Sequence, residues 1–338
     1  MTDIPLRRLP AVFLVLLCVG LAPAIWAWVS LDRPLHLEQP MIYDLARGGT
    51  IDSVAVDLSA AGVLPVPSIL FRLYARLTSQ RGHLQAGEYE LTAGMDTPAL
   101  LDLLRSGRVL VREITFVEGW TFADWRRHLA DHEKIVQTLA GDTDEALMAK
   151  MGFPGDFPEG RFFPDTYHYV SNETDLSILR RAHERMRLTL AREWEQANPP
   201  GVLTSPYEAL ILASIVEKET GFEPDREIIA GVFVNRLLKN MRLQSDPTVI
   251  YGITDFNGDL TRRDLVASTP YNTYTVAGLP PTPICNPGLA SIRATLNPAP
   301  VPYYYFVARG DGSSQFSVTL QEHNRAVAIY QKGGRQDP

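Results

Sequence analysis

The chain has 338 residues, of which 45% are hydrophobic and 21% are charged, a size that fits one large domain or two modest ones. Its formal net charge of -7 argues against a nucleic-acid-binding protein, because phosphate binding needs a basic surface. The two cysteines, Cys18 and Cys285, lie far apart, and Cys18 lies in an apolar run. We therefore expect neither a disulfide framework nor a cysteine-based metal site.

The first strong feature is an apolar run near the N-terminus. No charged residue occurs between Arg8 and Asp32. Because a membrane-spanning helix needs about 20 apolar residues, we predict a single-pass transmembrane anchor over residues 9–31. The preceding arginines predict that residues 1–8 stay in the cytoplasm, which localises the protein to the inner (cytoplasmic) membrane with the rest on the extracytoplasmic, periplasmic side. The alternative is a cleaved signal peptide, since Ala22-Pro23-Ala24 resembles a cleavage site.

After a polar, Pro-containing linker over residues 32–40, the pattern predicts a small α/β module over residues 41–111. Val54, Val56 and Leu58 alternate with other residues, as in a half-buried strand. The other elements expected are a helix over residues 68–77, a strand over residues 87–91, and a helix capped by Thr97 with Pro98 at its first position and Gly107 after its end.

A larger mixed domain is predicted over residues 112–338, which makes the fold class α+β. A strand near residues 114–117 is followed by Thr121 and Asp124, whose capping-box spacing predicts a helix start. The later elements expected are helices over residues 177–196, 206–220 and 225–238, and a strand over residues 303–307 among Pro- and Gly-rich loops.

The helix expected from Pro206 carries a pair of glutamates at its end. Ser205 stands at the cap position and the run 209–216 is almost wholly apolar, which predicts a helix buried over much of its circumference. Glu217 and Glu219 follow, and Gly221 is the expected C-terminal cap.

Turning the helix by about 100° per residue places Glu219 on its bulkiest apolar stripe, beside Leu212, Ile215 and Val216, and Glu217 on the opposite side. A carboxyl group among apolar neighbours at the negative end of a helix dipole has a raised pKa. A general acid for glycosidic bond cleavage needs such a group. The alternative is that both glutamates are solvated residues at a helix end.

Other polar residues suit a sugar-binding groove, although each could equally belong to a surface turn. Glu159, Asp165, Tyr167 and His168 lie in or beside an aromatic stretch, and aromatic rings stack on sugar rings. The remaining candidates are Asn235, Arg236, Gln244, Asp246, Tyr271, Asn272 and Tyr274. The chain contains no Gly-rich phosphate loop, no H-E-x-x-H and no G-x-S-x-G, and its histidines are scattered, so we expect no cofactor and no metal.

Several segments together resemble one known family, the endolytic murein transglycosylases, also called YceG-like. They occur in the family's order between Arg112 and Lys332. They are Val117-Glu118-Gly119, residues 159–167, 213–220, 234–237 and 241–252, Tyr271-Asn272-Thr273-Tyr274, Gly278-Leu279-Pro280-Pro281, Asn286-Pro287-Gly288 and Tyr305-Phe306-Val307. Cys285 departs from the pattern, because a small residue is expected there.

The resemblance implies that residues 41–111 form a LysM-like module and that Glu219 is the catalytic acid and base. It implies cleavage of the MurNAc–GlcNAc bond of nascent peptidoglycan, within the strand, to give a 1,6-anhydro-MurNAc end, and a role in terminating strand elongation. The implied partners are peptidoglycan strands, the membrane through the N-terminal helix, and peptidoglycan synthases. The predicted substrate-binding residues are Glu159, Asp165, Tyr167, Asn235, Arg236, Gln244, Asp246, Tyr271, Asn272 and Tyr274.

Two alternatives stay open at this point. One is a hydrolase of the same bond, in which Asp246 or Asp165 activates water opposite Glu219. The other is a non-catalytic scaffold that binds peptidoglycan.

Overall fold

The computed structural model describes residues 25–78 and 84–331. The chain divides into two compact units, Met1–Arg112 with His168–Asn172, and Glu113–Tyr167 with Glu173–Pro338. Most of the predicted anchor lies outside the described residues, although residues 25–31 are helical. Within the described ranges, no helix is long and apolar enough to cross a bilayer.

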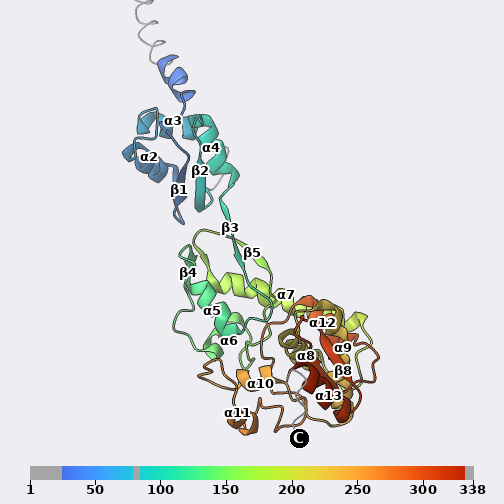
Figure 1. The fold of residues 1–338 in the computed structure, drawn as a ribbon. Helices are drawn as coiled ribbons and strands as arrows, with labels where there is room; N and C mark the ends of the chain where they lie inside the picture. The colour runs from blue at the N-terminus through green and yellow to red at the C-terminus, as the bar shows by residue number, and fades with distance from the viewer. Residues whose placement is uncertain (1–24, 79–83, 332–338) are drawn as a thin grey trace, which may run out of the picture. The chain divides into compact units, whose positions relative to one another are not determined.

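The first unit is built on an antiparallel pair of strands, β1 (Met41–Leu45) and β2 (Gly87–Leu91), in which Tyr43 lies opposite Tyr89. The chain passes through helices α2 (Ile51–Ala60) and α3 (Ser68–Leu77) between these strands, and α4 (Thr97–Ser106) follows β2 (Figure 1). Apolar side chains of all five elements, among them the fully buried Phe71, meet in one core. Helix α3 and strand β2 have the predicted bounds.

Helix α2 occupies the segment predicted to be a strand, and that prediction was wrong. Thr50 and Ser53 form a capping box, in which each side chain accepts a hydrogen bond from the other residue's N–H. Val54 and Leu58 are buried, whereas Val56 is 57% exposed. Val54 and Leu58 are four residues apart, a spacing that places both on one face of a helix and also on one face of a strand. The short pattern therefore fitted the helical period of 3.6 as well as the strand period of 2.

The helices predicted from residues 177 and 225 begin two residues earlier, at Asp175 and Glu223, and two helix caps differ from the prediction. Asp96, rather than Thr97, caps α4, because its carboxylate accepts a hydrogen bond from Ala99 N at 2.8 Å. The helix that carries the glutamate pair ends at Glu219, one residue before the predicted end, and Thr220 follows in extended backbone rather than a left-handed Gly221 cap.

Strands β3 (Val111–Thr115) and β5 (Thr166–Val170) pair with each other, and the division between the units falls within both. The second unit then contains α5 (Phe122–Ala130), β4 (Ile135–Val136), α6 (Asp144–Met151), β6 (Glu173–Thr174), α7 (Asp175–Gln196), α8 (Pro206–Glu219), α9 (Glu223–Leu238), α10 (Asp246–Tyr251), α11 (Arg262–Val266), α12 (Leu289–Leu296), β7 (Tyr305–Ala308), β8 (Ser314–Ser317) and α13 (Leu320–Tyr330). The capping box predicted at Thr121 and Asp124 is confirmed.

Helix α8 lies at the centre of the second unit, packed against α7, α9, α10 and α12 (Figure 1). Every residue from Ala209 to Val216 is buried, as predicted. Phe233 of α9 and Ile292 of α12 belong to the same core. This burial fixes the rotation of α8 and therefore the direction in which the residues at its C-terminal end point.

Candidate active site

Glu219 is the last residue of α8, and its side chain meets the start of α10. Its Oε1 accepts a hydrogen bond from Ser245 Oγ at 2.5 Å. Ser245 is only 1% exposed and is the residue immediately before α10. In the described part of the chain, Oε2 of Glu219 accepts no hydrogen bond. One oxygen of the carboxyl is thus held in place while the other is left available.

A network of threonine hydroxyls fixes Ser245. The Ser245 N–H donates to Thr273 Oγ1 at 3.0 Å, and Thr248 Oγ1 donates to the Ser245 carbonyl at 2.7 Å. The two threonine hydroxyls are themselves 2.8 Å apart. Gln244, just before, has a φ of 52°, a left-handed conformation that a non-glycine residue adopts at an energetic cost. The chain therefore turns sharply at the point where it presents Ser245 to Glu219.

The environment of Glu219 favours its protonated form. Burial raises the pKa of this carboxyl to about 7, and the negative charge of Asp246 acts in the same direction. The Ser245 hydrogen bond and the positive charge of Arg236 oppose the rise. Glu219 therefore titrates near neutral pH, which suits a group that must donate a proton in one step and accept one in the next.

Three polar side chains that the sequence singled out lie around this carboxyl. Tyr274 OH donates to Asp246 Oδ1 at 2.6 Å. Burial, and to a smaller extent this hydrogen bond, raises the pKa of Tyr274. The Gln244 amide oxygen lies 3.5 Å from Arg236 Nη1. Gln244 and Asp246 are exposed, so they can contact a ligand that reaches Glu219.

Arg236 is the buried cation of the cluster. Its Nε donates to the Tyr304 carbonyl at 2.6 Å and its Nη1 to the Leu243 carbonyl at 2.7 Å. The guanidinium also lies 5.3 Å from the centre of the Tyr305 ring. Arg236 therefore ties the chain before Ser245 to the chain entering β7, while its charge acts on Glu219.

Other predicted site residues bond to the protein itself. Asn235 Nδ2 donates to the carbonyls of Val301 and Tyr303, and Tyr167 OH donates to the Phe163 carbonyl. Asn272 is fully buried. Its Nδ2 donates to three backbone carbonyls before it, and its Oδ1 accepts from Tyr274 N at 2.9 Å.

Two more predicted residues, Tyr271 and Asp165, bond to neighbouring side chains. Tyr271 OH pairs with Thr282 Oγ1 at 2.8 Å, and Asp165 forms an ion pair with Arg185 at 2.5 Å. His168 lies exposed on β5. A substrate-binding role stays a prediction for these residues, because the contacts observed are bonds within the protein that stabilise its loops. They are Asn235, Tyr167, Asn272, Tyr271 and Asp165.

A second carboxyl with a raised pKa has a different setting. Burial raises the pKa of Glu159 to about 7, and Glu159 is 4% exposed. Its Oε1 accepts from Phe122 N at 2.9 Å and its Oε2 from Tyr251 OH at 3.1 Å. Both oxygens are thus occupied, and Glu159 joins the start of α5 to the end of α10.

Glu217, the other member of the pair, faces away from this cluster. Its Oε2 accepts a hydrogen bond from Gly288 N at 3.0 Å, and its Cγ lies against Gly119. Cys285, the position that departs from the family pattern, is buried with its Sγ 3.3 Å from the Ser214 carbonyl. Both residues help to attach the loop around residue 286 to α8, on the side opposite Glu219.

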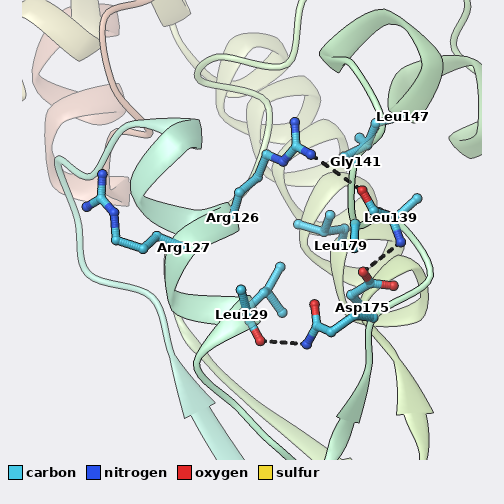
Figure 2. Close-up of a pocket in the computed structure, with 11 residues that line it drawn as sticks. Arg126, Arg127, Leu129, Leu139, Gly141, Leu147, Asp175 and Leu179 are labelled. Carbon is cyan, nitrogen blue, oxygen red and sulfur yellow. Dashed lines mark hydrogen bonds between the residues drawn. The ribbon is translucent and has the colours of Figure 1, made fainter. Parts of the chain in front are cut away.

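A separate pocket of about 320 Å³ lies among α5, the loop before α6 and α7 (Figure 2). Its polar groups are used within the protein, since Arg126 forms an ion pair with Asp144 and bonds to the Leu139 carbonyl, and Asp175 accepts from Leu139 N at 3.0 Å. No predicted site residue lines it. It carries none of the acid–base chemistry found at Glu219.

Sequence reasoning named Ser245 beside Gln244 and Asp246 but did not connect it with Glu219. The signal was present, because Ser245 stands between Gln244 and Asp246 in a segment that had already been singled out. Nothing in the sequence showed that a hydroxyl 26 positions after Glu219 would lie in hydrogen-bond contact with it.

A central buried helix that ends in one carboxyl titrating near neutral pH defines a protein with an acid–base type of active site. The chain belongs to the YceG-like family, whose model matches residues 43–329.

Similar proteins agree with this assignment. The chain is 32% identical to an endolytic murein transglycosylase of Bacillus subtilis (strain 168), over 85% of this chain and 84% of that protein. It is 27% identical to an endolytic murein transglycosylase of Streptococcus pneumoniae (strain D39), over 84% of this chain but only 57% of that protein. A crystal structure of a yceG-like protein from Listeria monocytogenes matches with a TM-score of 0.54 and 27% identity, covering 86% of this chain and all of that one.

Proposed function

We propose that this protein is a peptidoglycan lytic transglycosylase that cleaves the MurNAc–GlcNAc bond with Glu219 as its catalytic acid and base. The observation that carries the proposal is the Glu219 carboxyl, which burial brings to a pKa of about 7 and which Ser245 holds by one oxygen. The relatives named endolytic murein transglycosylase support the reaction class. Their name also supports cleavage within the strand.

In the proposed reaction, protonated Glu219 donates its proton to the leaving GlcNAc oxygen as the glycosidic bond breaks. The resulting carboxylate then takes the proton of the MurNAc 6-hydroxyl, whose oxygen forms a bond to the anomeric carbon. The products are a GlcNAc hydroxyl and a 1,6-anhydro-MurNAc end, and no water is consumed. Glu219 is protonated again by the second transfer, so one carboxyl completes the cycle.

The competing reaction is hydrolysis with Asp246 as the second carboxylate, since this side chain is exposed and its charge reaches Glu219. Asp165 is a poorer candidate because Arg185 holds it in an ion pair. Mass spectrometry of products from uncrosslinked glycan strands tests the proposal. We expect 1,6-anhydro-MurNAc ends. Reducing ends, one water heavier, would establish a hydrolase, and intact strands bound to folded protein would establish a scaffold.

The wider setting is also part of the proposal. The β1-α2-α3-β2 order of the first unit supports a LysM-like, glycan-binding module. The apolar run over residues 9–31 supports a single-pass anchor in the cytoplasmic membrane, with both units on the outer side. That location would bring the enzyme to nascent strands, where cleavage terminates their elongation beside the synthases.

The pKa of Glu219 predicts the pH dependence of the reaction. The first step needs the protonated acid, and its fraction falls as the pH rises through about 7. We therefore expect kcat/KM to decrease tenfold per pH unit on the alkaline side, with a midpoint near 7 in the free enzyme. A rate profile from pH 5 to 9 measures this. A rate that stays constant up to pH 9 would contradict the role of Glu219 as acid.

Ser245→Ala is expected to move this alkaline limb. The Ser245 hydroxyl stabilises the charged form of Glu219, so its loss raises the carboxyl pKa and shifts the midpoint upward by about one pH unit. Ser268→Ala, at an exposed position, serves as the control and should leave the profile unchanged. A shift to lower pH in Ser245→Ala would refute the role assigned to the hydroxyl.

A further inference from the structure

An open groove of about 820 Å³ runs along α7 in the second unit. It is rich in arginine, with Arg180, Arg181, Arg185 and Arg192 on its walls, and Leu188 and Leu289 contribute apolar surface. The chain as a whole has a net charge of -7, so this concentration of guanidinium groups is contrary to the overall charge. Such a surface favours anionic ligands that also present some apolar area.

The arginines lie along one stripe of the helix. Arg181, Arg185 and Arg192 are separated by four and seven residues, which keeps them on one face, and the half-exposed Leu188 stands between the last two. From Arg181 to Arg192 the helix rises about 16 Å. An extended peptide of about five residues covers that distance.

The guanidinium groups of Arg185 and Arg192 retain donors for a ligand. Arg181 pairs with Glu173, Arg185 with Asp165 and Arg192 with Glu193, yet the three arginine side chains remain 44%, 53% and 55% exposed. Each guanidinium has five N–H donors, and one carboxylate occupies at most two of them. Because the arginine side of each pair remains about half exposed, an added anion can share the same cations.

Two of the acidic side chains near the groove are shared with arginines that do not line it, which leaves an excess of positive charge there. Glu184, which lines the groove, is held by two hydrogen bonds from Arg187 at 2.7 and 2.8 Å. Glu193 is nearly buried and is shared between Arg192 and Arg293. Arg180 donates to the Lys150 carbonyl, a neutral acceptor, so its positive charge is not neutralised by that bond.

We propose that this groove binds the acidic peptide stems carried by the peptidoglycan strand, apart from the Glu219 site that acts on the sugars. The inference rests on the proposed function for the identity of the polymer. The stems are short, extended peptides with free carboxylates and small apolar side chains, which match the arginine stripe and the exposed apolar surface of Leu188 and Leu289. The concave shape also suits a peptide better than a flat bilayer surface.

The test is binding of the full-length Glu219→Gln protein, in which the strands are not consumed. Uncrosslinked strands with intact stems are compared with the same strands after an amidase has removed the stems. We expect tighter binding of the strands with stems. Arg181→Gln and Arg192→Gln should each weaken that binding about threefold, and the double variant about tenfold, with little change for the bare strands. Raising the salt concentration should reduce the difference.

Arg325→Gln is the matched control, because it removes the same charge from an exposed position on α13 that neither lines this groove nor holds one of its carboxylates. Equal binding of both kinds of strand, or equal losses in the double variant and the control, would overturn the proposal. The proposal would also be overturned if the double variant kept its preference for strands with stems but lost binding to anionic phospholipid vesicles. Consumption of the strands by Glu219→Gln would contradict the catalytic role of Glu219, whereas equal binding of both kinds of strand would contradict the role of the groove, so the two failures are distinguishable.

Discussion

Glu219→Gln is expected to lower turnover of uncrosslinked glycan strands by at least about 10³-fold while leaving the fold intact. The amide has the shape of the carboxyl and can still accept the hydrogen bond from Ser245. It cannot donate a proton to the leaving oxygen or remove one from the MurNAc 6-hydroxyl. Both steps of the proposed reaction therefore fail together. The measurement is the rate of appearance of 1,6-anhydro-MurNAc ends.

Glu217→Gln is the matched control for that experiment, since it makes the same change two residues earlier on the same helix. Its amide oxygen can keep the bond to Gly288 N, and most activity should remain. Equal losses of activity in the two variants would contradict the assignment of different roles to Glu219 and Glu217. Anhydro product formed by Glu219→Gln at a rate close to wild type would remove the catalytic assignment altogether.

Stability separates a catalytic loss from a folding defect. The pKa of Glu219 is raised on folding, so the folded state binds its proton more tightly than the unfolded state does. This contribution to stability is lost as the pH rises from about 4.5, the ordinary value, through about 7. Glu219→Gln has no carboxyl to ionise at this position and so does not lose this stability as the pH rises. At pH 8 the variant should therefore melt at a temperature no lower than wild type.

The helical-face argument succeeded at Glu219 because it used a property that does not depend on tertiary structure. A long apolar run makes a buried helix, and 100° per residue then decides which side chains point the same way. The structure places Glu219 in the setting that raises its pKa and turns Glu217 toward Gly288 on another side. No comparable rule predicts which distant loop supplies the partner, and so the contact with Ser245 was missed.

The same rule failed where the segment was short. Val54, Val56 and Leu58 cover five positions, too few to distinguish a period of 2 from one of 3.6. The capping pair Thr50 and Ser53 carried the decisive information, because a reciprocal pair of side-chain bonds marks the start of a helix. Local capping chemistry was a better guide here than alternation.

Polar loop residues were the hardest to interpret from sequence. Asn235 and Asn272 have the amide groups that would suit an N-acetyl sugar, but the structure uses them to satisfy backbone carbonyls of neighbouring loops. Both uses require the same donors, and the sequence does not reveal which acceptor is near. The exposed pair Gln244 and Asp246, by contrast, lies beside Glu219, within reach of a ligand.

Arg236→Met is expected to lower the free energy of unfolding by about 3 kcal/mol. Methionine keeps much of the apolar stem, but the carbonyls of Tyr304 and Leu243 lose their charged donor in a buried place. Thermal or urea unfolding measures the change. Arg325→Met, at an exposed position on α13, should stay within about 0.5 kcal/mol of wild type.

The same variant links the stability of the site to its chemistry. Arg236 carries the positive charge that lowers the pKa of Glu219, so its removal should raise that pKa and move the alkaline limb of kcat/KM to higher pH. Ser245→Ala shifts the limb in the same direction with a smaller loss of stability, because it removes one hydroxyl from Glu219 and leaves the two carbonyls bonded. A destabilised Arg236→Met with an unmoved alkaline limb would show that Arg236 is only a structural anchor, and that burial and Asp246 alone set the acidity of Glu219.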